Sequence, residues 1–122
     1  MKKTNEEYSI LYDFYGALLS ERQREVFEQY NEDNLSLSEI GANLGVSRQA
    51  VHIAVSKAGR ELVGYEEKLG LIAKHKAYEK ALAEINLKAD AILKDKMRLD
   101  PLEPETAKTL RRIKKLVKEL DL

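Results

Sequence analysis

The chain has 122 residues, of which 21 are basic and 21 acidic, and this zero formal charge argues against a strongly basic coat that binds nucleic acid non-specifically. The sequence contains no cysteine, which excludes disulfides and thiolate metal sites. A hydrophobic content of 43% with only two prolines indicates an ordered, helix-rich chain, long enough for one small domain and an appendage.

Two helices are predicted at the start of the chain. Between residues 6 and 19 the apolar side chains fall at steps of three and four, the period of an amphipathic helix. Ser20 then begins a Ser-x-x-Gln capping box, so we expect a second helix from Glu21 to about Tyr30, ended by the polar run NEDN at 31–34. The first helix should bury Tyr8, Leu11, Tyr12, Tyr15, Leu18 and Leu19.

A third and a fourth helix follow across a short turn. Ser36 heads another capping box, with Glu39 at its third position, which predicts a short helix. Gly45 can adopt the positive φ that ends such a helix, and the hydroxyl of Ser47 can cap the next helix from Arg48 onward. Two helices that meet across about three residues are typical of a helix-turn-helix motif.

The motif predicts its own core and its own contact face. Small residues at Gly41 and Ala42 suit the close approach of the two backbones. The packing core is expected at Ile40, Leu44, Gly45, Val46 and Val51, with Val55 beyond them. The outer face of the second helix should contact DNA, the first residues at base edges and the later ones at phosphates, through Arg48, Gln49, His52, Ile53, Ser56 and Lys57.

The wider stretch LSERQREVFEQYNEDNLSLSEIGANLGVSRQAVHIAVSKAGREL, residues 19–62, resembles the C-terminal promoter-reading domain of bacterial sigma factors, region 4. Two residues depart from the sigma pattern. Gly41 stands where alanine is usual and costs about 1 kcal/mol of helix propensity. Gly59 is expected to interrupt the fourth helix, so both glycines would soften the motif.

The chain as a whole, with LYDFYGALLSERQREVF before the motif and GYEEKLGL after it, resembles the YlxM family of small bacterial helix-turn-helix proteins. Members of that family are associated with the signal recognition particle pathway through gene neighbourhood. The resemblance therefore implies a regulator of that pathway, with protein partners in the signal recognition particle machinery.

A helical tail is predicted after Gly70. Residues 71–99 lack proline and glycine and can form one long helix. Its apolar residues recur every seven positions, the pattern of a coiled-coil or paired-helix seam: Leu71, Tyr78, Ile85, Ile92 and Leu99, with Leu82 and Ala89 between them. We expect the tail to form a homodimer; the alternative is that the helix folds back onto its own chain.

A last helix should begin near Pro104, after the break at Pro101. Its stripe of Leu110, Ile113, Val117 and Leu120 requires a protein partner. The basic residues of the segment 108–119 favour an ordinary solvated face, with anionic lipid as a lesser alternative. A further possibility is contact with RNA through Arg111, Arg112, Lys114 and Lys115; if the implied pathway holds, the RNA of the particle is a plausible ligand.

Charge is uneven along the chain. Residues 1–65 hold seven basic and ten acidic side chains, a net −3, whereas residues 66–122 hold fourteen and eleven, a net +3. Few phosphates can therefore be neutralised by one copy of the motif, which is a second reason to expect a dimer. No apolar run approaches about 18 residues and no hydrophobic segment follows the first lysines, so we expect a cytoplasmic protein without membrane insertion.

Catalysis, cofactors and metals are not expected. His52 and His75 are 23 positions apart, and neither has a Cys or a Ser-Asp set arranged around it in the sequence. We therefore predict an all-α protein with a sigma-type helix-turn-helix domain over residues 1–70 and a helical, dimerising tail over 71–122. Its function would be regulation through DNA binding; the alternatives are an adaptor between proteins or an RNA-binding component of the signal recognition particle pathway.

Overall fold

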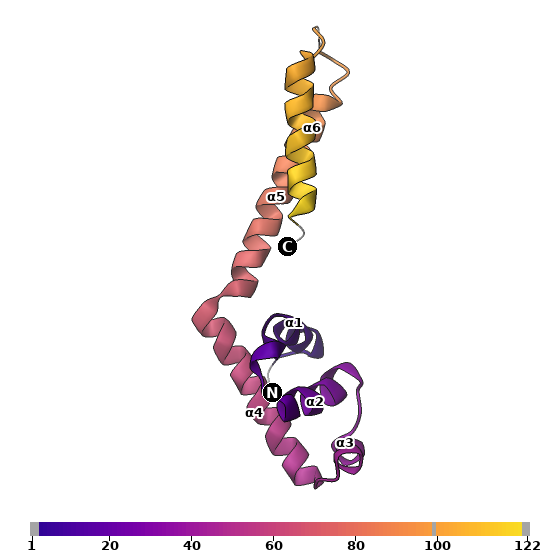
Figure 1. Ribbon diagram of the computed structural model, residues 1–122, viewed down its shortest axis with the longest axis vertical. Helices are drawn as coiled ribbons and strands as arrows, with labels where there is room; N and C mark the ends of the chain where they lie inside the picture. The colour runs from indigo at the N-terminus through magenta and orange to yellow at the C-terminus, as the bar shows by residue number, and fades with distance from the viewer. Residues whose placement is uncertain (1–2, 99, 121–122) are drawn as a thin grey trace. The chain divides into compact units, whose positions relative to one another are not determined.

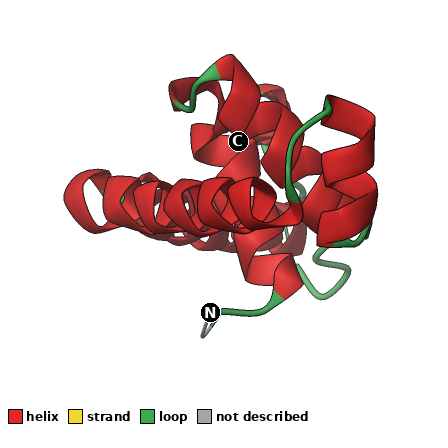
Figure 2. Cartoon of the chain, turned by 90° about the horizontal axis from the view of Figure 1, so that it is seen from below, coloured by secondary structure: helices red, strands yellow, loops and turns green. Residues whose placement is uncertain are grey.

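The computed structural model describes residues 3–98 and 100–120, which form six α-helices, two short helical turns and no β-strand (Figures 1 and 2). This confirms the all-α prediction. The chain divides into two compact units, residues 1–72 and 73–122. No helix in the described part of the chain is long and apolar enough to cross a lipid bilayer.

The first unit is built around one long helix. The helices α1 (Asn5–Tyr15), α2 (Glu21–Phe27) and α3 (Leu37–Leu44) each pack against α4 (Arg48–Leu69), as Figure 1 shows. The short turn η1 (Gly16–Leu18) follows α1, and the π-helical turn η2 (Glu28–Glu32) continues α2.

The helix starts follow the capping residues that the sequence predicts. The hydroxyls of Ser20 and Ser36 accept from the backbone N–H of Gln23 and Glu39 at 3.2 and 3.1 Å, and those two side chains bond back to the serine N–H groups. Both predicted capping boxes are therefore confirmed. A third box, at Thr4, starts α1 in the same way.

The first predicted helix is too long. It ends at Tyr15 and tightens into η1, so Leu18 points into solvent while Leu19 stays buried. The tighter turn has about 3.0 residues per turn instead of about 3.6, so each residue rotates the chain by a larger angle and the α-helical spacing behind the prediction does not apply at Leu18. Burial of Leu18 was therefore a wrong prediction.

The second predicted helix changes to a π-helical turn after Phe27, where one buried polar side chain contacts α1. Asn31 is buried in η2, and its amide nitrogen donates to the hydroxyl of Ser9 at 2.9 Å and to the carbonyl oxygen of Asn5 at 3.2 Å. The wider π-helical turn is accompanied by this bond to α1, which a buried amide requires. Tyr30, in the same turn, is half-buried.

Two apolar clusters hold the first unit together. One joins α1 to the second half of α4 and the first residues of the following helix; it includes two aromatic contacts of Phe27, with Tyr8 edge-on and Tyr12 stacked. The other lies where α2, α3 and the first half of α4 meet, and its fully buried members are Val26, Ile40, Val51 and Val55. The second cluster supports the helix-turn-helix motif.

The second unit contains most of α5 (Leu71–Leu93) and α6 (Pro104–Glu119). Pro104 occupies the first turn of α6, as predicted. The helix α5 ends at Leu93, earlier than the expected residue 99, and Leu99 itself lies outside the described residues. Lys114 of α6 forms an ion pair with Asp90 of α5, and Figure 1 shows the two helices side by side.

Only part of the predicted seam of the tail is covered in one chain. Ala89 is buried and Leu82 half-buried. Tyr78, Ile85 and Ile92 remain 56%, 44% and 41% exposed. The hairpin of α5 and α6 thus buries the intermediate seam positions and leaves these three positions of the seven-residue repeat open.

Candidate nucleic-acid interface

The turn between α3 and α4 is closed by hydrogen bonds to one carbonyl. Gly45 has a φ of 69°, and its N–H donates to the carbonyl oxygen of Gly41. The N–H of Val46 donates to the same oxygen at 3.0 Å, the 6→1 bond of a Schellman motif. The hydroxyl of Ser47 then accepts from the N–H of Ala50 at 3.0 Å and caps α4.

Gly41 lies where the turn approaches α3 closely. A Cβ on this residue would lie 2.7 Å from the carbonyl oxygen of Val46, closer than real Cβ contacts permit. The missing side chain therefore lets the turn fold tightly onto α3. The lower helix propensity of Gly41 thus accompanies a backbone approach that alanine would obstruct, and the expectation that Gly41 softens the motif stays a prediction.

The expected interruption at Gly59 is wrong. The helix α4 runs without a break through 22 residues, and Gly59 is buried among the residues that face the rest of the unit. Helix formation here is supported by packing, since Ala58 and Leu62 on either side are also buried. Tertiary contacts commonly override a single weak helix former.

The five residues predicted to form the core of the motif differ in how deeply they are buried. Ile40 and Val51 are fully buried, and Leu44 is half-buried against them. Gly45 supplies the left-handed turn. Val46 is 38% exposed, and its backbone rather than its side chain makes the close contact of the turn.

The six predicted DNA-contacting residues lie together on the first three turns of α4. Arg48, Gln49, His52 and Lys57 are exposed. Ile53 is 58% exposed, and Ser56 is half-buried at the edge of this face. Among the described residues, no ion pair involves Arg48 or Lys57, so both cations are available to an anionic ligand.

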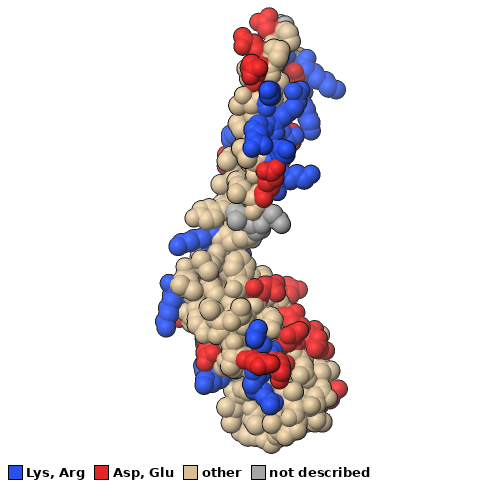
Figure 3. Space-filling view, viewed as in Figure 1, with Lys and Arg blue, Asp and Glu red and all other residues tan. Residues whose placement is uncertain are grey.

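The charge around the motif is sparse. On the face drawn in Figure 3, acidic side chains gather over the region of α1 and α2, while the tip where α3 meets α4 carries few charges. Glu39 is the acidic residue of α3, and the hydrogen bond from the N–H of Ser36 lowers the pKa of its carboxyl, followed by the bond with the Ser36 side chain. It therefore remains negative near the motif at neutral pH.

Sequence reasoning missed a hydrogen-bonded link at the end of α4. The buried hydroxyl of Tyr15 donates to Glu66 and accepts from the N–H of Leu71 at 3.1 Å, and the N–H of Ile72 donates to Glu66 at 3.0 Å. Burial, followed by the bond to Glu66, raises the pKa of Tyr15. The link provides hydrogen-bond acceptors for the first N–H groups of α5, next to the left-handed Gly70. The sequence signal for this link was only the glycine that ends α4.

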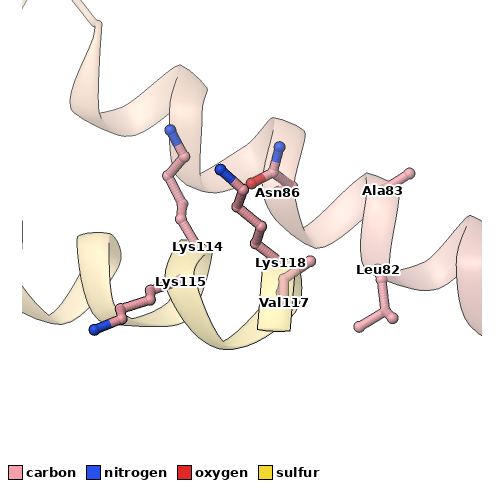
Figure 4. Close-up of a pocket in the computed structure, with 7 residues that line it drawn as sticks. All are labelled: Leu82, Ala83, Asn86, Lys114, Lys115, Val117 and Lys118. Atoms are coloured by element: carbon pink, nitrogen blue, oxygen red, sulfur yellow. The ribbon is translucent and has the colours of Figure 1, made fainter. Parts of the chain in front are cut away.

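The tail unit carries a separate groove. A hollow of about 530 Å³ is lined by Leu82, Ala83 and Asn86 of α5 and by Val117 of α6. Lysines of α6 line it as well, as Figure 4 shows: Lys114, Lys115 and Lys118. The apolar stripe predicted for α6 is therefore partly covered by α5, with Leu110, Ile113 and Val117 half-buried and Leu120 exposed.

Metal-ligand side chains do not gather. In residues 3–98 and 100–120, no group of three or more His, Asp or Glu side chains is placed to hold a metal ion. His75 lies 3.6 Å from the carboxylate of Glu79 along its own helix.

The capped turn, its buried core and the exposed first turns of α4 define a helix-turn-helix protein. Comparison with known families agrees, since the family model described as "Putative helix-turn-helix protein, YlxM / p13 like" matches residues 1–100. The chain belongs to this family, which confirms the resemblance predicted from its sequence. The likeness to sigma factors stays a prediction.

Several relatives align along nearly the whole chain. A UPF0122 protein of Thermoanaerobacter sp. (strain X514) is 40% identical over 93% of this chain and 93% of its own length. UPF0122 proteins of Acetivibrio thermocellus and Listeria welshimeri are 37% and 36% identical over 93% and 92% of this chain, covering 93% and 97% of their own lengths. No solved structure matches the chain.

Proposed function

We propose that this protein binds DNA through the exposed face of α4 and acts by occupying its site, with no chemical step. The observation that carries the proposal is the row of exposed side chains on the first turns of α4. This row directly follows the turn that Gly41 and Gly45 allow to close. Arg48 and Gln49 can pair with guanine and adenine edges in a major groove, while Lys57 contacts a phosphate. The protein would then be a cytoplasmic regulator.

The tail supports a dimer in this proposal. Within the described residues of the second unit, only Ala89 is buried, so the hairpin of α5 and α6 has almost no core of its own. A second copy that covers Tyr78, Ile85 and Ile92 would complete a four-helix arrangement. Two helix-turn-helix motifs would double the phosphate contacts and suit a two-fold symmetric site.

Binding to labelled duplex DNA and duplex RNA at three salt concentrations tests the DNA-binding proposal. If Lys57 and Arg60 each contact one phosphate, the logarithm of the binding constant should fall with the logarithm of salt with a slope of about −2 per copy. The variant Arg48→Ala/Gln49→Ala should lose the preference of the protein for one DNA sequence over others. Arg22→Gln, an exposed cation of α2, is the control. Wild-type protein that binds neither duplex would refute the proposal.

The dimer has its own test. Ile85→Glu introduces a charge on the open face of α5 and should shift the protein to monomer in analytical ultracentrifugation. Leu87→Glu is the matched control, because Leu87 is 68% exposed and lies on the other side of the same helix. A monomeric wild type, or equal effects of the two variants, would contradict dimerisation through this face.

A second candidate function is that of an adaptor, or an RNA-binding component, of the signal recognition particle pathway. The lysine-lined groove of the tail favours it, together with the net +3 charge of residues 66–122. Docking of apolar side chains changes little with salt, whereas phosphate contacts weaken steeply. Binding that survives Arg48→Ala/Gln49→Ala and depends weakly on salt would favour the adaptor.

A further inference from the structure

A shallow hollow lies on α4 beyond the residues expected to read bases. Its volume is about 440 Å³. Gly64 leaves its floor open, because a Cβ on this residue would meet no atom within 4 Å. The hollow is lined by Lys57, Arg60, Glu61, Gly64, Tyr65 and Lys68.

The lining is predominantly positive. Lys57, Arg60 and Lys68 contribute three cations, and no ion pair within the described part of the chain involves them. The one carboxylate, that of Glu61, accepts a hydrogen bond from the side-chain nitrogen of Gln23 at 3.1 Å, which directs it toward α2. Uncompensated cations around an open hollow attract an anion that can accept hydrogen bonds from several of them.

The hollow continues the contact face of the motif. Ile53, Lys57, Arg60, Gly64 and Lys68 follow one another at steps of four, three, four and four, so they share one side of α4. From Ile53 to Lys68 this row extends about 22 Å at the rise of an α-helix. Lys57 belongs both to the predicted contact residues and to the hollow, which makes the two surfaces continuous.

We propose that this hollow binds neighbouring backbone phosphates of the nucleic acid that α4 contacts, a step that rests on the proposed function. The first turns of α4 enter the groove, and the later turns pass over the strand that borders it. Lys57, Arg60 and Lys68 donate to the phosphate oxygens, while Gly64 leaves room for the backbone to approach. Such contacts fix the register of the protein without reading sequence.

The test compares two charge-removing variants of the full chain. Arg60→Gln/Lys68→Gln should make the salt slope less negative by about 2 and weaken binding of all sequences alike, because each lost phosphate contact changes the slope by about one. Arg22→Gln/Arg24→Gln removes the same charge from the exposed face of α2 and should leave the slope unchanged. An unchanged slope in the first variant, or an equal change in the second, overturns the proposal.

A steric variant tests the space above Gly64. Gly64→Leu extends into open volume, so helix content and thermal stability should be retained while binding of every sequence weakens. Wild-type binding in a folded Gly64→Leu protein would overturn close approach at this position. Displacement of the nucleic acid by inorganic phosphate beyond the effect of chloride at equal ionic strength, dependent on Lys68, would show a free-anion site and overturn the assignment to a backbone.

The outcomes separate the two levels of inference. If wild type fails to bind, or Arg48→Ala/Gln49→Ala binds as wild type does, the proposed function fails and the phosphate contact fails with it. If binding requires Arg48 and Gln49 but is indifferent to Arg60 and Lys68, only the hollow is assigned wrongly.

Discussion

Two glycines inside helices of the first unit should respond to alanine in opposite directions. Gly41→Ala gains about 1 kcal/mol of helix propensity but brings a Cβ to 2.7 Å from the carbonyl oxygen of Val46. Relieving the clash requires a backbone shift in a turn held by two hydrogen bonds, and overpacking of this kind costs about 1–3 kcal/mol. We therefore expect a net loss of about 1 kcal/mol in the free energy of unfolding.

Gly64→Ala is the matched control, because its Cβ would meet nothing within 4 Å. It should stabilise the protein by up to about 1 kcal/mol, so the two variants should differ by about 2 kcal/mol. Urea denaturation of the full chain, followed by far-UV circular dichroism at one protein concentration, measures both values. Equal stabilisation by the two substitutions would show that the turn relaxes without cost and would refute the requirement for glycine at 41.

Three further predictions concern the hydrogen bonds of the first unit. Tyr15→Phe removes the acceptor of the Leu71 N–H and the donor to Glu66, so it should lower the free energy of unfolding by about 1–2 kcal/mol and speed hydrogen exchange at Leu71; unchanged exchange would contradict the link. Ser36→Ala should cost about 1 kcal/mol in urea denaturation, whereas Ser38→Ala, an exposed residue within α3, should cost little. Because the pKa of Glu39 is lowered in the folded state, its stabilising contribution is present above the unfolded pKa and is lost as pH falls through the folded value. The stability of Glu39→Gln should accordingly vary less with acidic pH than that of wild type.

Local patterns in the sequence were sufficient for the framework of the fold. The serine capping boxes, Gly45, Ser47 and Pro104 act on neighbouring backbone groups, so their effect can be read from spacing alone. The same spacing places the predicted contact residues on one stretch of α4. The family was recognisable for the same reason, since the order of these signals along the chain is specific.

Tertiary structure decided the features that depend on residues far apart in the chain. The π-helical turn accompanies the bond from Asn31 to Ser9. The need for glycine at position 41 comes from the carbonyl of Val46 across the turn. Helix propensity alone predicts that glycine destabilises α3 at this position. These outcomes depend on which atoms meet after folding, and a periodic pattern in one helix does not contain that information.

The hollow on α4 combines both kinds of information. The spacing of Lys57, Arg60, Gly64 and Lys68 was present in the sequence as a row along one helix face. Only the folded unit directs Glu61 toward Gln23 and leaves the space above Gly64 open. Sequence thus determined where the helices begin, turn and expose their cations, whereas packing between helices decided which of those cations remain uncompensated.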